Sequence, residues 1–308
     1  MLLLHLLLAL PIPLLTTTTT TTTTIIRNPI PNNMANTENA VHHHYSLCLT
    51  DTAISPSSSP TTTAMVILNS PIENPPSPLF ERLWQQSSFR ICADGGANRL
   101  YQATVASAVT PNQLYLPDLI TGDLDSLESN VRSYYESHKV PILRQYDQDF
   151  NDLDKSIRSI PTNYQTCLVY GAFGGRFDQE MGAVQALYAH AERIPNIWLY
   201  NDQNASILLQ PGQHVLHCPN FGDATTVLGE GPTCGLIPLG QPCDKVTTQG
   251  FQWNLDNAPL AFGALVSTSN RLVASTVHVE CSHPLLFTAE IQIPLSAAVR
   301  SPNGSNTG

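Results

Sequence analysis

Hydrophobic and polar positions divide the chain into stretches of different texture. Between residues 64 and 203, short apolar runs alternate with longer segments whose apolar residues recur every three or four positions. This pattern predicts a parallel sheet with helices on both faces, because crossover helices bury such a sheet on either side. The predicted strands are 65–69, 89–93, 119–121, 141–144, 166–170 and 197–200. The predicted helices are 79–86, 98–103, 130–137, 152–160 and 178–193.

After residue 204, apolar and polar positions alternate and are interrupted by Gly, Pro and Asn. A period of two is typical of strands that expose one face. These predicted strands are 206–210, 214–217, 247–255, 265–267, 276–280 and 286–291. We therefore expect an α/β fold in which an N-terminal doubly wound, mostly parallel sheet domain (64–203) is followed by a C-terminal antiparallel β-sandwich domain (204–295).

The first 63 residues differ from both halves. An apolar run over 1–15 contains two prolines and no preceding Lys or Arg, and it is shorter than the roughly 20 residues of a membrane-spanning helix. Nine threonines follow, and then a stretch rich in Thr, Ser, Pro and Asn that includes three histidines at 42–44. Such a composition buries too little apolar surface to fold. We expect a low-complexity, disordered leader over 1–63, in which the histidines are solvated rather than metal-bound, and a flexible tail over 296–308.

Composition and charge narrow the classes of function. The formal net charge is −10, which disfavours a nucleic acid or an anionic membrane as partner, since both need a basic face. Acidic residues in such a chain are better suited to binding cations. The seven cysteines include no C-x-x-C pair, so neither a zinc cluster nor a disulfide framework is indicated. We expect a cytoplasmic protein in a reducing compartment.

Ligands of open α/β sheets bind beyond the carboxyl ends of the strands, so residues that follow each predicted strand are the first candidates for a site. After the second strand come Asp94, Gly95, Gly96 and Asn98. The glycines allow a tight turn, and the next helix offers its unpaired amide groups to a phosphate. Taken alone, these residues are better explained as a structural turn, because the chain has neither a G-x-G-x-x-G nor a G-x-x-x-x-G-K-[ST] motif.

Asp123 and Asp125 follow the third strand. Residues two apart on an extended chain point to the same side, so these carboxylates are expected to project together. Two like charges repel unless a cation or a proton lies between them, and Mg²⁺ prefers carboxylate oxygens. Asp125 could instead cap the following helix, but this leaves Asp123 unexplained. The metal interpretation is therefore favoured.

Four carboxylates crowd the segment 147–155, where a helix is predicted to start. Within it, Asp152 and Lys155 are three residues apart and so share one face of that helix. A solvated, favourably charged helix N-terminus is the simpler alternative. The presence of a second acidic cluster after another strand of the same sheet favours a shared cation instead.

After the fifth strand, glycines precede Arg176, Asp178 and Gln179. Arginine makes forked hydrogen bonds to phosphate oxygens, so this segment suits an anionic ligand, whereas Asp178 alone is better explained as a helix N-cap. Together, the carboxylates, glycines and arginine indicate a magnesium-nucleotide site for phosphoryl transfer. No Ser-His or Cys-His arrangement for nucleophilic catalysis is apparent in the sequence.

At these residues the chain resembles the thiamine pyrophosphokinase family, eukaryotic type, from about residue 65 to 291. The similar stretches are ADGGANRLY (93–101), GDLDS (122–126), DQDFND (147–152), GRFDQ (175–179), LLQPGQH (208–214), CGLIPLGQPC (234–243), WNL (253–255), LAFGALVSTSN (260–270) and HPLL (283–286). Each stretch is unspecific alone, but nine in the same order across both predicted domains form a specific signal.

The resemblance implies an enzyme that transfers the terminal diphosphate of ATP to the hydroxyl of thiamine, with Mg²⁺ as cofactor, and releases AMP and thiamine diphosphate. It also implies a homodimer in which thiamine lies between the α/β domain of one subunit and the sandwich of the other. By match to the family's motifs, the residues around magnesium and diphosphate are Asp94, Asp123, Asp125 and Asp152, and the positions that line the thiamine pocket are Gln148, Trp253, Ser267 and Asn270. From the residues themselves, we expect Arg176 to neutralise charge on the phosphate oxygens. The further ligand-binding candidates are Gly95, Gly96, Asn98, Asp149, Lys155, Asp178 and Gln179.

Thiamine carries a cationic thiazolium and a flat pyrimidine, so Trp253 could supply stacking and a cation–π contact of roughly 0.5 to 2 kcal/mol. Without the resemblance, a tryptophan in a sandwich strand is better interpreted as core. The chain departs from the family at Phe150 and Asn151, where members have a polar residue and then threonine, which puts a hydroxyl role at residue 151 in doubt. Two alternatives stay open: another phosphotransferase on the same scaffold, and a thiamine or nucleotide binder without turnover.

Overall fold

The structure is a computed structural model that describes residues 41–45, 63–106, 114–218 and 228–293. The first half alternates strands and helices in the order β2 Thr63–Ile67, α1 Pro78–Gln86, β3 Phe89–Ala93, α2 Gly96–Ala106, β4 Leu119–Gly122, α3 Ser129–Ser137, β5 Ile142–Arg144, α4 Asp152–Ser159, β6 Thr166–Tyr170, α5 Phe177–Ala189 and β7 Asn196–Tyr200. Every strand and helix predicted for this half is present, and the ends shift by no more than four residues.

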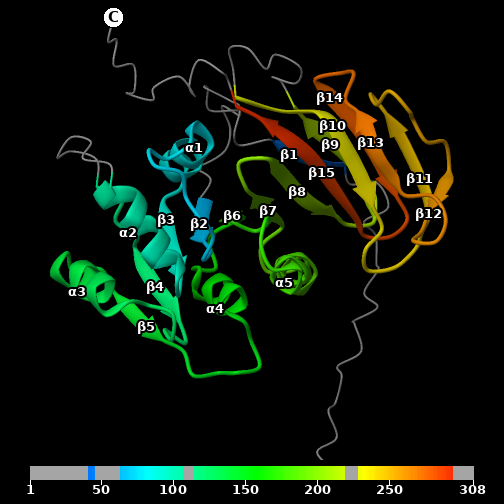
Figure 1. Cartoon of the computed structure of the whole chain (residues 1–308). Coiled ribbons are helices and arrows are strands. Elements are labelled where there is room, and N and C mark those ends of the chain that lie inside the picture. Colours follow the sequence, from blue (N-terminus) through cyan, green and yellow to red (C-terminus); the bar gives the residue numbers. More distant parts are fainter. Residues whose placement is uncertain (1–40, 46–62, 107–113, 219–227, 294–308) are drawn as a thin grey trace, which may run out of the picture. The chain divides into compact units, whose positions relative to one another are not determined.

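These strands form the parallel part of a ten-stranded sheet with the order β13-β10-β15-β8-β7-β6-β2-β3-β4-β5. Neighbours from β7 to β5 are parallel, whereas β7 and β8 are antiparallel. The chain moves outward from β2 to β5 and then returns to the other side of β2 with β6 (Figure 1). Such a reversal of direction opens a crevice at the carboxyl ends of the adjacent strands.

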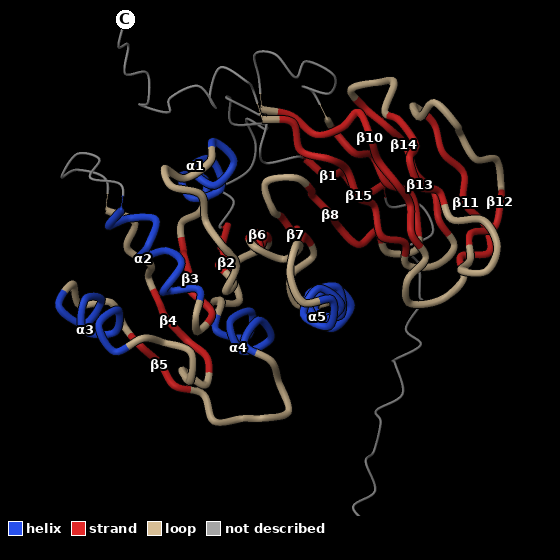
Figure 2. The backbone as a smooth tube through the Cα atoms, viewed as in Figure 1, coloured by secondary structure: helices blue, strands red, loops and turns tan. Residues whose placement is uncertain are grey.

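Side chains of the parallel strands alternate between two hydrophobic layers. Met65 and Ile67 of β2 lie in a core with α1, α2 and α3, whereas Ala64 and Val66 lie in a second core with α4 and α5. Figure 2 shows α2 and α3 on one side of β3 and β4, and α4 and α5 on the other. The alternation follows from strand geometry, in which successive side chains point to opposite faces. Burial on both faces explains why central strands such as β2 and β6 are largely apolar in sequence.

The second half is antiparallel. Its strands are β8 Asn204–Leu209, β9 Gly212–His217, β10 Gly229–Ile237, β11 Cys243–Gln249, β12 Ala258–Leu260, β13 Ser267–Arg271, β14 Thr276–Cys281 and β15 Leu285–Gln292. Four of them extend the ten-stranded sheet, and the others form a second sheet with β1 (Val41–Tyr45), in the order β1-β9-β14-β11-β12. Apolar side chains of both sheets, such as Phe287 and Val277, share one core. The predicted α/β fold with an antiparallel sandwich is confirmed.

The predicted strand boundaries are less accurate in the sandwich. β10 was not predicted, because its glycines and Pro232 read as a loop; a register shift between Glu230 and Cys234 accommodates this proline within the sheet. The short strand β12 was also missed. The prediction of one strand over 247–255 is wrong beyond Gln249, because Gly250 has a φ of +91° and turns the chain.

The expectation of an unfolded leader is wrong for residues 41–45. These residues form β1 and pair in parallel with β9, and the side chain of His44 is buried rather than solvated. The remainder of the predicted leader up to residue 62 and the predicted tail over 296–308 lie outside the described residues.

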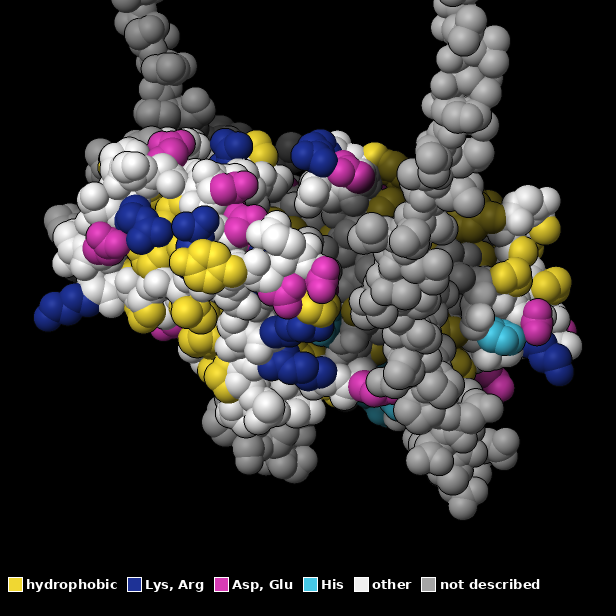
Figure 3. Space-filling view, turned by 90° about the horizontal axis from the view of Figure 1, so that it is seen from below, with side chains coloured by type: hydrophobic (Ala, Val, Ile, Leu, Met, Phe, Trp, Pro, Cys, Tyr) yellow, Lys and Arg dark blue, Asp and Glu magenta, His cyan; other side chains and the backbone are white. Residues whose placement is uncertain are grey.

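Within the described ranges, no helix combines the length and the apolar character needed to cross a bilayer. On the face seen in Figure 3, acidic and basic side chains lie close together among hydrophobic ones.

Candidate active site

A cavity of about 660 Å³ lies at the carboxyl ends of β2, β3, β4 and β6. Its wall is formed by the loops that follow these strands and by the starts of α4 and α5. The polar side chains that line it include Asn69, Asp94, Asp123, Gln148, Asp149, Asp152, Lys155, Arg176 and Gln179. The cavity therefore occupies the crevice that the strand order creates.

Three carboxylates from three different elements meet in this cavity. Asp94 follows β3, Asp123 follows β4 and Asp152 is the first residue of α4, and one oxygen of each lies within 4.8 Å of the others. Asp94 has a φ of +42°, a left-handed backbone that turns its side chain at the end of the strand. Three carboxylate oxygens at such mutual distances could hold one divalent cation.

The electrostatics of the cluster favour a cation. Asp94 is only 4% exposed; its Oδ2 accepts a 3.1 Å hydrogen bond from the N–H of Ser126, and its Oδ1 has no partner within the described part of the chain. Burial raises the pKa of Asp94, and the charges of Asp152 and Asp123 raise it further. The pKa of Asp152 is also raised, first by burial and then by Asp123. An ion among these groups would relieve both the desolvation and the repulsion.

Gly122 makes the convergence sterically possible. It has a φ of +146°, and a Cβ built on it would lie 2.9 Å from Oδ1 of Asp152 and 3.0 Å from Cβ of Asp94. Any larger residue would displace one of these side chains. The glycine of the GDLDS stretch is thus required by the packing of two carboxylates.

Lys155 places a positive charge beside the carboxylates. Its side chain is 3% exposed, and its Nζ lies 3.5 Å from Oδ1 of Asp152, one helical turn earlier in α4. The start of this helix is fixed by Asn151, whose Oδ1 accepts the N–H of Asp154 at 2.8 Å. The expectation that Asp152 and Lys155 share a helix face is confirmed, and Asn151 acts as the N-cap.

The expectation that Asp123 and Asp125 project together is wrong. Asp125 is exposed and does not line the cavity, and its Oδ1 accepts the hydroxyl of Ser126 at 2.9 Å. The reason is Leu124, whose φ of +62° breaks the extended conformation that the argument assumed.

Two residues of the ADGGAN stretch have structural roles. Nδ2 of Asn98 donates to the carbonyl of Ser126 at 2.7 Å, and its Oδ1 accepts the N–H of Glu128 at 3.1 Å. A Cβ on Gly96 would lie 2.2 Å from the carbonyl oxygen of Ile67, so this glycine allows α2 to approach β2. Neither residue lines the cavity, whereas Gly95 does.

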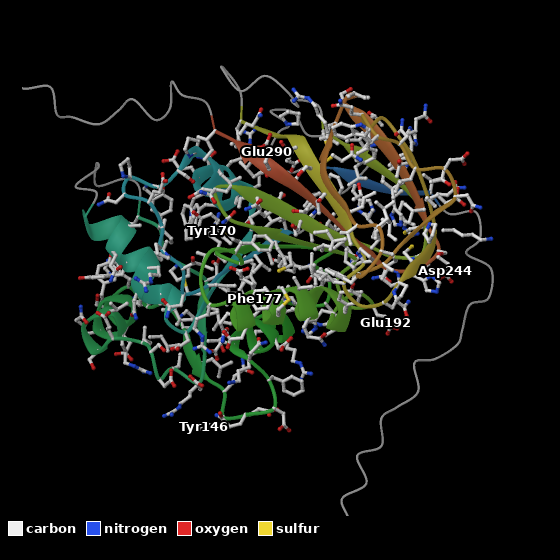
Figure 4. The ribbon with its side chains drawn as sticks, turned by 45° about the vertical axis from the view of Figure 1, so that its right-hand side comes forward. Tyr146, Tyr170, Phe177, Glu192, Asp244 and Glu290 are labelled. Atoms are coloured by element: carbon white, nitrogen blue, oxygen red, sulfur yellow. The ribbon has the colours of Figure 1, made fainter. Side chains whose placement is uncertain are left out.

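Arg176 lines the cavity but is paired in this conformation. Its guanidinium donates to both carboxylate oxygens of Asp178, which lowers the pKa of that carboxyl. Asp178 is the second residue of α5 and Arg176 is its N-cap residue, so the interpretation of Asp178 as N-cap is wrong. The exposed Phe177 lies between them at the start of α5 (Figure 4).

The loop between β5 and α4 brings Gln148 and Asp149 to the cavity wall, and both are exposed. Tyr146 lies in the same loop, at the bottom of the view in Figure 4. Sequence reasoning missed Asn69 and Ser70, because it extended the first strand to residue 69, whereas β2 ends at Ile67. The signal that could have found them is the Asn-Ser-Pro sequence, which is typical of a turn.

A second group of predicted residues lies in the sandwich. Nδ2 of Asn270 donates to the carbonyl of Trp253 at 2.9 Å and to Oγ of Ser267 at 3.3 Å, and Oδ1 accepts the N–H of Trp253 at 3.2 Å. Trp253 is 58% exposed, so the interpretation as a core residue is wrong. None of the three lines the cavity, whose wall contains only residues of the α/β half.

Comparisons with known proteins match both halves of the chain. Residues 80–199 match the model described as thiamin pyrophosphokinase, catalytic domain, and residues 213–286 match the thiamin pyrophosphokinase vitamin B1 binding domain. The chain is 37% identical over 223 residues to thiamine pyrophosphokinase 1 of Oryza sativa subsp. japonica, with 68% of this chain and 81% of the relative covered. The chain belongs to the thiamin pyrophosphokinase family.

Two further relatives of this family agree. Thiamine pyrophosphokinase 1 of Arabidopsis thaliana is 37% identical over 244 residues, with 74% of this chain and 86% of the relative covered. The solved thiamin pyrophosphokinase from Candida albicans superposes with a TM-score of 0.67 at 27% identity, with 82% of this chain and 93% of that chain covered. The catalytic-domain match contains the three carboxylates, and the vitamin B1 match contains Trp253 and its partners. The family resemblance expected from sequence is confirmed.

Proposed function

We propose that the chain transfers a diphosphate group from Mg-ATP to the hydroxyl of thiamine, giving thiamine diphosphate and AMP. The observation that carries the proposal is the convergence of Asp94, Asp123 and Asp152 within 4.8 Å at the cavity of a chain that belongs to the thiamin pyrophosphokinase family. The relatives' names indicate thiamine as the substrate. The carboxylates and cationic side chains of the cavity are suited to a magnesium nucleotide.

The residues present fit a magnesium ion. The donor set consists of hard carboxylate oxygens, and one buried oxygen, Oδ1 of Asp94, has no hydrogen-bond partner in the described part of the chain. Asp94, Asp123 and Asp152 would hold Mg²⁺, which neutralises charge on phosphate oxygens when bound. Asp125 lies outside this group, so we assign it no metal-binding role.

Two cations of the chain would act on the phosphates. Lys155 is fixed and desolvated beside Asp152, so its charge is already in place. Arg176 is exposed, and an exposed ion pair contributes little to stability, so its guanidinium can exchange Asp178 for phosphate oxygens at small cost. We propose in-line attack by the thiamine hydroxyl on the middle phosphorus, with these residues orienting the polyphosphate.

We further propose that the active chain is a homodimer in which thiamine binds between subunits. Trp253, Ser267 and Asn270 are connected to one another but do not line the cavity of their own chain. The exposed indole of Trp253 offers a face for the thiamine rings. In a dimer, the sandwich of one subunit can bring this face to the cavity of the other, so that each site is formed by two subunits.

A cytoplasmic location belongs to the same proposal. The cysteines in the described ranges are free thiols, and all of them are buried. Free thiols are typical of proteins in reducing compartments. Fractionation of cells that express the chain checks this expectation, and recovery in a secreted fraction would contradict it.

The activity is tested by incubating the chain with ATP, thiamine and Mg²⁺ and by separating the nucleotides. The proposal expects AMP that appears only when thiamine and Mg²⁺ are both present. Release of ADP would indicate a different phosphotransferase, and thiamine binding without AMP would indicate a binder without turnover. The variant Asp123→Asn is expected to lose turnover more than nucleotide affinity, because it removes a metal ligand. Near-normal turnover of this variant with Mg²⁺ would overturn the assignment of the metal site.

A further inference from the structure

The side-chain amide of Asn69 packs directly on Gly95 at the wall of the cavity. Asn69 lies in the loop after β2, and Gly95 lies in the turn between β3 and α2. A Cβ built on Gly95 would lie 2.4 Å from Nδ2 of Asn69 and 2.7 Å from its Cγ. The absence of a side chain at residue 95 is therefore what gives the amide its place.

Arg99 determines which way this amide faces. Nε of Arg99, in the first turn of α2, donates a 2.8 Å hydrogen bond to Oδ1 of Asn69. Because a guanidinium only donates and an amide oxygen only accepts, the bond assigns the oxygen to the Arg99 side and the NH₂ group to the Gly95 side. Nδ2 of Asn69 makes no hydrogen bond within the described residues. The result is an oriented donor with two hydrogens, on the wall of the cavity.

The chemistry of this wall suits a phosphate. The three carboxylates of the site hold negative charge and are suited to a cation, whereas Asn69 contributes a neutral group whose oxygen already accepts from Arg99. Its NH₂ group has no partner among the described residues, and a ligand atom that receives its hydrogens must be an acceptor. In a cavity for a magnesium nucleotide, the acceptors are the phosphate oxygens that the metal does not bind.

We propose that Asn69 donates through Nδ2 to a phosphate oxygen of the bound nucleotide and that Arg99 is a positioning residue that holds the amide in this orientation. The inference rests on the proposed function for the class of ligand. It predicts that Arg99 acts through Asn69 rather than by its own charge. If the pair only fastened the loop after β2 to α2, its removal would change stability and leave nucleotide affinity unaltered.

The test is titration calorimetry of the full chain with a Mg²⁺-loaded, non-hydrolysable ATP analogue, together with steady-state kinetics. Asn69→Ala is expected to raise the nucleotide Kd about tenfold, the size of one hydrogen bond to a charged group, with KM for ATP rising in parallel and KM for thiamine unchanged. Asn69→Asp keeps the hydrogen bond from Arg99 but replaces the donor by a negative charge. It is therefore expected to bind the analogue more weakly than Asn69→Ala.

The role of Arg99 is tested by a double-mutant cycle. Arg99→Ala is expected to lower the affinity for the analogue in the wild-type background. It is expected to cause no further loss of affinity in the Asn69→Ala background, because Arg99 acts through the amide of Asn69. The matched control is Arg132→Ala on α3, whose side chain pairs with Glu136 on the surface and does not line the cavity. This control is expected to match the wild type in both assays.

The outcomes separate the inference from the proposed function. If the wild-type chain releases AMP with thiamine and Mg²⁺ but Asn69→Ala binds the analogue as tightly as the wild type, the inference is overturned and the proposed function stands. An equal loss from Arg99→Ala in both backgrounds overturns the positioning role, because the arginine then acts on its own. If the nucleotide affinities change as expected but the chain releases no AMP, the inference is supported and the proposed activity is overturned. A wild type that binds no nucleotide overturns both.

Discussion

The backbone N–H of Asp123 donates a 3.2 Å hydrogen bond to Oδ1 of Asp152, the same oxygen that lies 3.5 Å from Nζ of Lys155. The loop after β4 and the start of α4 therefore meet at one carboxylate oxygen. One N–H and one buried cation offset part of the repulsion among the three carboxylates before a metal binds. The position of the cluster therefore depends on the backbone geometry of the loop after β4 and of the start of α4.

Replacement of Gly122 by alanine is expected to lower turnover strongly. The new Cβ would lie 2.9 Å from Oδ1 of Asp152, and the φ of +146° is unfavourable for any L-residue with a side chain. We expect a loss of about 100-fold or more in kcat, because the metal ligands are displaced, and a loss of about 1 to 3 kcal/mol in the free energy of unfolding. Kinetics of AMP release and urea denaturation measure the two effects. A wild-type kcat would show that this glycine does not set the positions of the carboxylates.

Asp94→Asn is expected to stabilise the metal-free protein while it abolishes activity. The folded-state pKa of Asp94 is raised, so the stability that its neutral form provides is lost as pH rises from the unfolded value through the folded one. At pH 7.5 the asparagine avoids this loss and still accepts the N–H of Ser126. We expect a gain on the order of 1 kcal/mol in the free energy of unfolding, measured with EDTA present.

Asp152→Asn is the matched comparison for this prediction. It also removes a charge from the cluster, but it leaves the buried ammonium of Lys155 without its carboxylate. This variant is expected to be less stable than the wild type under the same conditions. A loss of stability in both variants would show that repulsion among the carboxylates is not a significant cost in the metal-free protein.

The parallel half could be predicted from sequence because its strands are buried on both faces. Strands such as β6 are continuously apolar, and the helices between them have a distinct period. β10 could not be predicted, since Pro232 normally excludes a central strand and only a register shift accommodates it. β1 was missed because histidine counts as polar in a hydrophobicity pattern. In the structure, His43 and His44 lie within hydrogen-bond distance of His217 and His214 of β9.

The candidate site was predicted in part for similar reasons. Asp123 and Asp152 were predicted because acidic segments that follow separate strands of one parallel sheet meet at its carboxyl edge. Asp94 was assigned to the same group by the resemblance to the family, since on its own its segment is better explained as a structural turn. Asp125 was wrongly included, because its orientation depends on one left-handed residue, Leu124, that periodicity does not reveal. Asn69 was missed because the predicted first strand extends to residue 69, whereas β2 ends at Ile67. Its hydrogen bond with Arg99, 30 residues later, cannot be read from hydrophobic periodicity.

The proposed dimer predicts complementation between two impaired variants. Trp253→Ala is expected to raise KM for thiamine about 2- to 30-fold through loss of a cation–π contact, and Asp123→Asn to lose turnover. If one site uses the α/β half of one subunit and the sandwich of the other, a mixed dimer contains one intact site. Co-expression with random pairing should restore about a quarter of wild-type activity at low thiamine. No recovery in a preparation shown to contain mixed dimers would place both residues in the same subunit's site.

The attachment of β1 to β9 is expected to weaken as pH falls below about 6.5. Nε2 of His44 lies 2.9 Å from Nδ1 of His214, whose Nε2 lies 2.6 Å from the carbonyl oxygen of Gln210. The carbonyl can only accept, so His214 donates through Nε2 and accepts from His44 through Nδ1. Both rings are neutral in this arrangement. Burial, together with neighbouring histidines, lowers the pKa of His44 to about 3, and burial lowers that of His214 to about 4.

Because the folded-state pKa values lie below the unfolded value of 6.5, the stability that these histidines provide is complete above 6.5 and is lost as pH falls toward 4. The loss is at most about 1.4 kcal/mol per pH unit for each ring. Hydrogen exchange of the amides of β1 and β9 at pH 7.5 and 5.0 measures it. His44→Leu should remove about half of the pH dependence, because the buried His214 remains, whereas His138→Gln, at an exposed histidine after α3, should leave it unchanged. The other histidines near the pair are His42, His43, His217 and His278. If the pH dependence of His44→Leu equalled that of the wild type, His44 would make no contribution.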